Sequence, residues 1–364
     1  ISEDHVVTAD PLDASQIEIL RGPETLLYGN TAIGGAVNVT DEAIAETPVG
    51  KPFTGEALTR FGDSADNEKT YAAKIKGQAG KFNWHASGFS RETDDYEIPG
   101  NSESDRQLAA EGEVPEEDNE GKVNSSDTDT QSATVGGSYV WDSGFVGLSV
   151  NGFQSDYGVP GHSHGHHEEH GHGDEDHDED HDEDHDEDHE DEDHDEDHDD
   201  DDHDGEEEEE SVAIESEQVR VELRGRVDTQ GDAVESVKWN ASYTDYEHDE
   251  IEGEEIGTTY EKETFEARTE FIHTPVGRFS GVFGLQVLHE DFSAVGEESF
   301  LVPTETFSPA AFFFEEYEIS NDVKLDFGGR VEFVSQDPDN SSSEEFVPFS
   351  LSAGPVWKIC DGDY

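Results

Sequence analysis

The chain is marked by strict alternation of apolar and polar residues. In the stretch 219–224 three aliphatic residues alternate with three charged ones, and the same pattern runs through 237–244 and 323–333. A period of two, rather than 3.6, predicts β-strands with one apolar and one polar face. The sequence therefore predicts a sheet that is dry on one side only.

About twelve such segments follow one another after residue 50. We place them at 54–62, 69–79, 81–93, 127–141, 143–156, 212–229, 233–250, 260–274, 277–293, 307–320, 322–336 and 343–358. Tight turns fall near Gly80, Asp142-Ser143, Gln230-Gly231, Pro275-Val276 and Asn321, and longer links span 94–126, 157–211, 251–259 and 294–306. Every longer link falls on the same side of the expected sheet. Short turns at one end and long loops at the other are typical of outer-membrane β-barrels.

A soluble β-sandwich would also bury one apolar strand face, but the one-sided placement of the long links favours an all-β, transmembrane antiparallel β-barrel. The charged strand face would then line a polar lumen, because charges on the lipid face cost several kcal/mol at the midplane. Aromatic residues at 84, 141, 239 and 243 fit the interfacial girdles of such a barrel, and they equally fit the ordinary enrichment of aromatics in strands.

Residues 1–50 have a different pattern. Ile17 and Ile19 flank Glu18 as in a short strand, Arg21-Gly22-Pro23 forms a turn, and 24–27 fits one helical turn. Glycines then precede a second apolar strand at 36–39. These residues predict a small mixed unit ahead of the barrel.

Composition narrows the class of protein. The 364 residues carry a net charge of -74, which argues against nucleic-acid binding and favours cations, or solubility in salty surroundings. The single Cys360 allows neither an internal disulfide nor a Cys-based zinc finger. No run of 18 apolar residues, P-loop or nucleophile–base motif is present, so we expect neither a membrane helix nor an enzyme. The chain starts at Ile1 and lacks Met, and we expect it to be an internal piece of a longer protein.

An insert at 161–210 carries the candidate chemistry. It holds 31 acidic residues and no Lys or Arg, so it must stay hydrated. Counting the links, with 62–68 as the first, places it in the third extracellular loop. Its 13 histidines are His162, His164, His166, His167, His170, His172, His177, His181, His185, His189, His194, His198 and His203.

Imidazole ligands suit zinc, copper and nickel, whereas calcium prefers oxygen and has no use for histidines. With about four ligands per ion, the insert would hold on the order of four to six zinc ions, each at modest affinity. The alternative is an acidic, solvated surface loop, which most acidic runs are. Binding that fades below about pH 6, as imidazoles protonate, would favour the metal-binding hypothesis.

The sequence also resembles a known family. The order Ile-Glu-Ile-Leu-Arg-Gly-Pro, Leu-Tyr-Gly and Gly-Gly-Ala-Val-Asn-Val within 17–39 is similar to the end of the plug domain of TonB-dependent outer-membrane receptors. The stretches 157–162, 252–275, 292–306 and 314–317 resemble their zinc-uptake branch, the ZnuD type. The His-rich loop is similarly placed in that branch, although the loop of this chain is longer and more acidic.

The resemblance implies a plugged barrel of the 22-stranded type, with the C-terminal part of the plug at 1–50 and about twelve barrel strands within 51–364. It further implies outer-membrane lipid of a Gram-negative bacterium as surroundings, the TonB-ExbB-ExbD complex as energy source and Zn²⁺ as substrate, with no organic cofactor. Arg21, Gly22, Pro23 and Glu24 would form the structural motif of the plug and could pair with barrel charges.

Three questions stay open. His248 and His289, near strand ends, are candidate transport-path ligands, although a lone strand histidine is more often structural. The cargo could be Ni²⁺ or Cu²⁺ instead of zinc, because imidazole and carboxylate ligands do not select zinc and copper binds them more tightly. It could also be haem or a metallophore. A surface binding or adhesion module that merely holds cations is the remaining alternative.

Overall fold

The structure is a computed structural model of the chain. It describes residues 7–29, 32, 34–62, 67–104, 106, 110, 120–163, 211–229, 231–253, 255–296, 299 and 301–359, and the side chains of 161–163 and 211 are not described. Nearly all of the regular structure is β. No helix in these ranges is long or apolar enough to cross a membrane.

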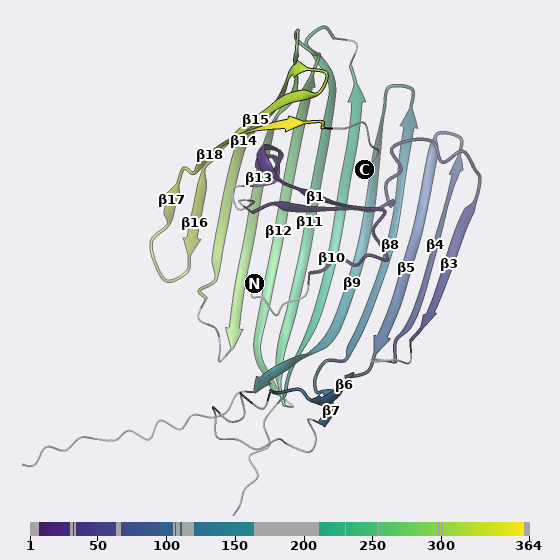
Figure 1. Cartoon of the computed structure of the whole chain (residues 1–364), viewed down its shortest axis with the longest axis vertical. Coiled ribbons are helices and arrows are strands. Elements are labelled where there is room, and N and C mark those ends of the chain that lie inside the picture. Colours follow the sequence, from purple (N-terminus) through teal and green to yellow (C-terminus); the bar gives the residue numbers. More distant parts are fainter. Residues whose placement is uncertain are drawn as a thin grey trace, which may run out of the picture.

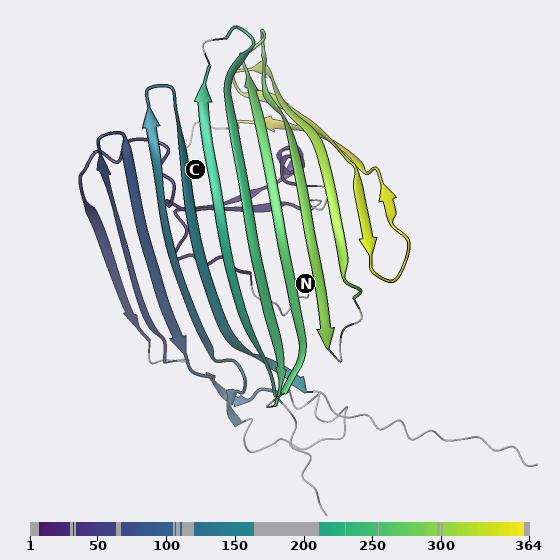
Figure 2. The same cartoon turned by 180° about the vertical axis from the view of Figure 1, so that it is seen from behind.

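A large antiparallel sheet of 14 strands dominates the molecule (Figures 1 and 2). Its strands follow the chain order β3-β4-β5-β8-β9-β10-β11-β12-β13-β14, and β15 to β18 complete it beyond β14. The strands are β3 Thr54–Phe61, β4 Lys69–Ala79, β5 Phe82–Thr93, β8 Thr128–Trp141, β9 Gly144–Ser163, β10 Ser211–Asp228, β11 Val234–Glu252, β12 Glu255–His273, β13 Phe279–Gly296, β14 Thr304–Ser320, β15 Val323–Glu332, β16 Val334–Pro338, β17 Glu344–Phe346 and β18 Phe349–Trp357.

The alternation in the sequence produces two unlike faces. In β10, Val219 and Leu223 are 52% and 40% exposed, whereas the side chains of Glu222 and Arg224 are 12% and 19% exposed. We call the face that carries Glu222 and Arg224 the inner face, because the N-terminal segment contacts it, and the other the outer face. On the outer face Trp239 packs over its cross-strand partner Gly225, where a Cβ would lie 2.2 Å from the indole ring.

The predicted strands are confirmed, and four details differ. Strand β9 continues to Ser163 instead of ending at 156. The link proposed at 251–259 is wrong: β11 and β12 extend to Glu252 and Glu255 and are joined by a tight turn in which Gly253 has φ +60°. The link at 94–126 contains a small hairpin of β6 Tyr96–Asn101 and β7 Glu120–Val123. The last two predicted strands are each split, near Phe333 and Pro348.

Proline explains both splits. Phe333 donates its N–H to the carbonyl of Pro309, and Glu332 donates to the carbonyl of Pro348. Neither proline has an N–H to return a ladder bond. The sheet therefore loses regularity where these residues face one another.

The tight turns lie at one end of the sheet (Figure 1). The turns after β4, β8, β12 and β14 lie at the upper end in Figure 1, where β10 also ends, whereas β3, β5, β9 and β13, from which the longer links start, end at the lower end. The one-sided placement expected from the sequence is thus confirmed for these links.

The N-terminal segment crosses the inner face (Figures 1 and 2). It contains β1 Gln16–Leu20, paired antiparallel with β2 Ala36–Thr40, and between them the 3-10 helix η1 Gly22–Leu27. Gly22 has φ +77°, a conformation that favours glycine, and Pro23 lies in the first turn of the helix, where its missing N–H costs nothing. Helix η1 contacts β14, β15 and β18.

Candidate functional site

The His-rich insert is rooted at the end of the sheet that carries the longer links. Strand β9 runs to Ser163 and β10 starts at Ser211, and these two residues are paired across the ladder. His162 lies within β9, but its side chain is not described. The other predicted loop ligands, His164 to His203, lie outside the described residues.

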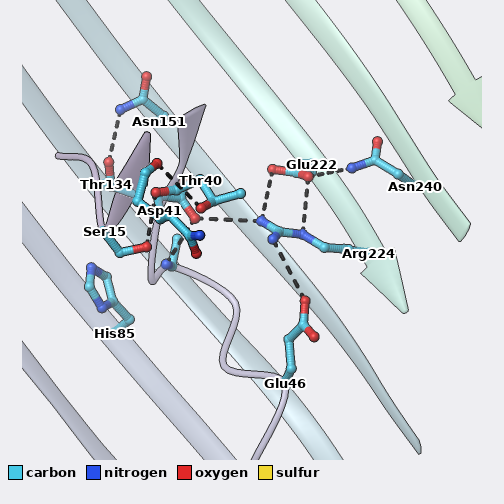
Figure 3. A network of polar contacts seen from close by, with 12 residues as sticks. Ser15, Thr40, Asp41, Glu46, His85, Thr134, Asn151, Glu222, Arg224 and Asn240 are labelled. Carbon is cyan, nitrogen blue, oxygen red and sulfur yellow. Dashed lines mark hydrogen bonds and ion pairs between the residues drawn. The ribbon is translucent and has the colours of Figure 1, made fainter. Parts of the chain in front are cut away.

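Arg224 is the centre of a polar network beneath the N-terminal segment (Figure 3). Its guanidinium lies 3.5 Å from Asp41 and 4.0 Å from Glu46 of that segment, and 3.2 Å from Glu222 on its own strand. Asn240 of β11 donates to Glu222, which fixes the carboxylate from the next strand. These ion pairs, rather than apolar packing, join the N-terminal segment to the large sheet, which we call the wall.

Further polar contacts join the N-terminal segment to the inner face of the sheet, along a contact zone that we call the seam. Arg91 pairs with the buried Asp10 at 2.7 Å, and Ser132 donates a 2.6 Å hydrogen bond to Asp13. Burial raises the pKa of Asp13 above its ordinary value despite that hydrogen bond. Lys76 donates to Glu42 at 2.9 Å, and this hydrogen bond is the main reason why the pKa of Glu42 is lowered.

A polar cavity of about 330 Å³ opens between the segment and the inner face. Its charged lining consists of Asp10, Asp13, Asp41, Arg220, Glu222 and Arg224. Because groups of both signs line it, the cavity is suited to hydrated or charged species rather than to an apolar ligand.

Helix η1 is held by a guanidinium from the wall. Arg268 of β12 donates to the carbonyl of Leu27, and its Cζ lies 5.3 Å from the ring centroid of Tyr28 and 4.5 Å from that of Phe312. Both distances are within cation–π range. The guanidinium therefore joins the helix to β12 and β14.

The suggested pairing of Arg21 and Glu24 with barrel charges is absent among the described residues. Both residues are exposed as a whole. Partial burial of the Glu24 carboxyl, together with nearby Glu18 and Asp326, raises its pKa. Gly22 and Pro23 do form the turn into η1. Within this motif Pro23 lies close to Gly328 of β15 and Gly354 of β18, whereas Arg268 contacts the C-terminal end of the helix.

His248 lies on the inner face of β11, between Ser216 of β10 and Tyr260 of β12. It is 1% exposed. Its ring stacks on Tyr260, with centroids 4.4 Å apart and planes 13° apart, and Tyr246 lies 5.5 Å away. This aromatic cluster lies four residue pairs from the pair Val212–Glu252, which is next to the root of the insert.

His289 lies on the outer face of β13, directly between Phe265 and Phe307 of the neighbouring strands. Gln286, three residues earlier, has the opposite orientation and bonds Arg330 at the inner face. His289 therefore does not share a face with His248, because an odd separation along a strand reverses the side chain. This orientation does not place His289 on a transport path along the inner face.

The sequence alone does not show that Asp10, Arg224 and Arg268 join the N-terminal segment to the sheet. The alternation marks Arg224 as inward-facing, but its partners are about 180 residues away in the chain. Only the folded geometry brings them together.

No protein-family model matches the chain. Solved structures with a similar fold include the FrpB iron transporter from Neisseria meningitidis (F3-3 variant), with a TM-score of 0.66 at 13% identity over 97% of this chain and 51% of that one. The copper transporter OprC gives a TM-score of 0.64 at 10% identity over 96% and 49%. The alcaligin outer-membrane receptor FauA from Bordetella pertussis gives 0.56 at 13% over 97% and 48%.

The chain spans about half the length of these structures. At 10–13% identity the similarity concerns the fold. The chain thus has the fold of about half of each of these structures: a large antiparallel sheet of barrel type with a segment across its inner face.

Proposed function

We propose that the chain is part of a TonB-dependent outer-membrane receptor that captures zinc, or a related divalent metal, through its His-rich extracellular loop and imports it past a plug. Residues 1–50 would belong to the plug and 51–364 to the barrel, with 157–211 as the loop. One observation carries the proposal: the strands on either side of the His-rich tract meet at paired Ser163 and Ser211, at the end of the sheet with the longer links.

The chemistry of the insert supports capture. Thirteen imidazoles and 31 carboxylates offer mixed N and O ligands, which suit borderline metals better than calcium. A tract with many modest sites would raise the local metal concentration at this end of the sheet. Preference for zinc over copper or nickel rests on the family resemblance.

Import would use the inner face. His248 is the candidate ligand that takes the ion from the loop, since it is buried on the inner face close to the root of the insert. The ion pairs at Arg224 and Arg91 would hold the plug at rest. Force from a TonB-ExbB-ExbD complex would break them, because polar contacts can be exchanged for water.

A haem or metallophore is the second candidate cargo. It is favoured by the cluster of Tyr246, His248, Tyr260 and Phe292, in which the Tyr260 and Phe292 centroids are 6.5 Å apart. Aromatic rings around an imidazole suit a planar ligand. A shift of the haem absorption band on adding the full-length receptor, lost in His248→Ala, would favour this cargo over a bare ion.

Metal content measured after equilibrium dialysis tests the proposal. The intact receptor should bind several zinc ions in the presence of excess calcium, and a receptor without 161–210 should lose most of them. Binding should fade below about pH 6, as imidazoles protonate near ~6.5. Unchanged zinc content after the deletion, or equal binding of calcium, would contradict capture by the loop.

A further inference from the structure

Five carboxylates stand in one row across the outer face. The registers pair Asp245 with Glu263, Glu263 with Asp291, Asp291 with Glu305, and Glu305 with Asp337, so that β11, β12, β13, β14 and β16 each contribute one. Like charges that face each other directly across strands destabilise a sheet. A cation bound at such a row would relieve this repulsion.

Among the described residues next to the row, no Lys or Arg side chain neutralises these carboxylates. The row borders a cavity of about 610 Å³ that is lined by eight carboxylates and by no Lys or Arg. Tyr243, which donates to Glu263 at 2.9 Å, offers a neutral hydrogen bond only.

A histidine lies two residues from the row, on the side of the tight turns, and faces the same way. The Nε2 of His289 lies 3.6 Å from an oxygen of Asp291, and its Nδ1 lies 3.8 Å from an oxygen of Glu305. Both distances exceed a hydrogen bond. One ligand atom from each of the three residues falls within 4.8 Å of the others, which happens for no other group of three His, Cys, Asp or Glu in the described part of the chain.

We propose that His289, Asp291 and Glu305 bind one divalent transition-metal ion on the outer face. One imidazole and two carboxylates supply three ligands, and a fourth position stays open for water, as in sites where zinc keeps three protein ligands. The imidazole selects a borderline ion over calcium or magnesium. The bound charge offsets the repulsion within the row.

The site lies outside the proposed import path and does not rest on it. His289 is flanked on the same face by Phe265 and Phe307, each 44% exposed. Aromatic residues on the outward face mark the membrane interface of a barrel. The ion would therefore sit on the outside of the wall, at the height where the apolar band gives way to the acidic row.

Modification of histidines by diethylpyrocarbonate, read residue by residue by mass spectrometry on the full-length receptor, tests this site apart from the loop. The His289 side chain is 40% exposed and open to the reagent. Zinc should protect it, and Asp291→Asn should raise the half-protecting zinc concentration at least about tenfold, as loss of a ligand does. His273, which bonds Glu315 at 3.1 Å at the opposite end of the sheet, serves as the reference whose modification zinc leaves unchanged.

A matched variant separates a site from a diffuse acidic surface. Glu247 lines the same cavity but is not one of the three ligands, so Glu247→Gln should change the half-protecting concentration by less than about threefold. Equal modification of His289 with and without zinc would overturn the proposal. Equal increases of the half-protecting zinc concentration in Glu247→Gln and Asp291→Asn would also overturn it, because they would indicate non-specific counter-ion binding to the acidic surface. Loss of the loop leaves the result unchanged, so failure here and failure of metal capture are distinguishable.

Discussion

Single residues decide how the N-terminal segment is held. Arg268 combines a hydrogen bond to a backbone carbonyl with two ring contacts, and its side chain is only 14% exposed. Arg224 makes three ion pairs. The sequence shows that both arginines face inward, through the period of two, but their partners come from distant stretches that only the fold brings together.

We expect Arg268→Gln to loosen helix η1. The loss of the carbonyl contact and the ring contacts should cost about 2 kcal/mol in the free energy of segment docking. Proteolysis between residues 20 and 29 in the full-length receptor should become faster. Arg278→Gln is the control, because Arg278 is exposed and bonds the carbonyl of Ile319 away from the segment; equal acceleration in both variants would contradict the account.

Asp13 and Glu42 should respond to pH in opposite ways. Because the pKa of Asp13 is raised in the fold, its ionised form lowers stability above that pKa, and the loss disappears as pH falls through it. Asp13→Asn, which keeps an acceptor for Ser132, should therefore leave stability at pH 7 unchanged or raise it by up to about 1 kcal/mol.

The pKa of Glu42 is lowered, so its contribution is present above the ordinary value of 4.5 and lost as pH falls through the lowered pKa. Glu42→Gln should cost about 0.5 kcal/mol at pH 7, after allowance for solvent screening, and nothing near pH 3. Denaturant unfolding of both variants at the two pH values checks these signs. A loss of stability in Asp13→Asn at pH 7 would show that its carboxylate is favourably bound.

Elements were the most predictable level of the structure. Alternation alone placed the strands, because the period of two is imposed on every strand with unlike faces. Where strands end was less predictable: β11 and β12 continue to a turn at Gly253 although their ends are polar. The splits at Phe333 and Pro348 depend on which residue a proline faces across the ladder, which one strand's sequence does not contain.

The insert should be dispensable for the sheet. Its removal, with a short turn from Ser163 to Ser211, shortens a long loop, and each halving of loop length recovers about 0.6 kcal/mol of closure entropy. It also removes 31 carboxylates. The thermal midpoint of the deleted receptor should be equal or higher; a clear fall would mean that the insert packs against the wall.

The whole molecule carries a large excess of negative charge. The net charge is -74, and -43 remains when the 31 acids of the insert are subtracted. We expect repulsion of this size to outweigh the partly buried ion pairs between the N-terminal segment and the inner face. Raising ionic strength from 0.01 to 0.15 M shortens the screening length from about 30 to about 8 Å.

The melting temperature should consequently rise with salt over that interval. Matched concentrations of sucrose, which adds no charge, serve as the control. A fall in melting temperature with salt would show that the ion pairs between segment and wall dominate the stability instead.

Zinc accumulation by cells tests the central claim most directly. Cells that make the full-length receptor should take up zinc at limiting concentration several-fold faster than cells whose receptor lacks 161–210, and the difference should vanish at excess zinc and without TonB. A collector raises local concentration and therefore lowers the half-saturating zinc concentration without changing the maximal rate. Equal uptake by both receptors at limiting zinc would contradict capture by the His-rich loop.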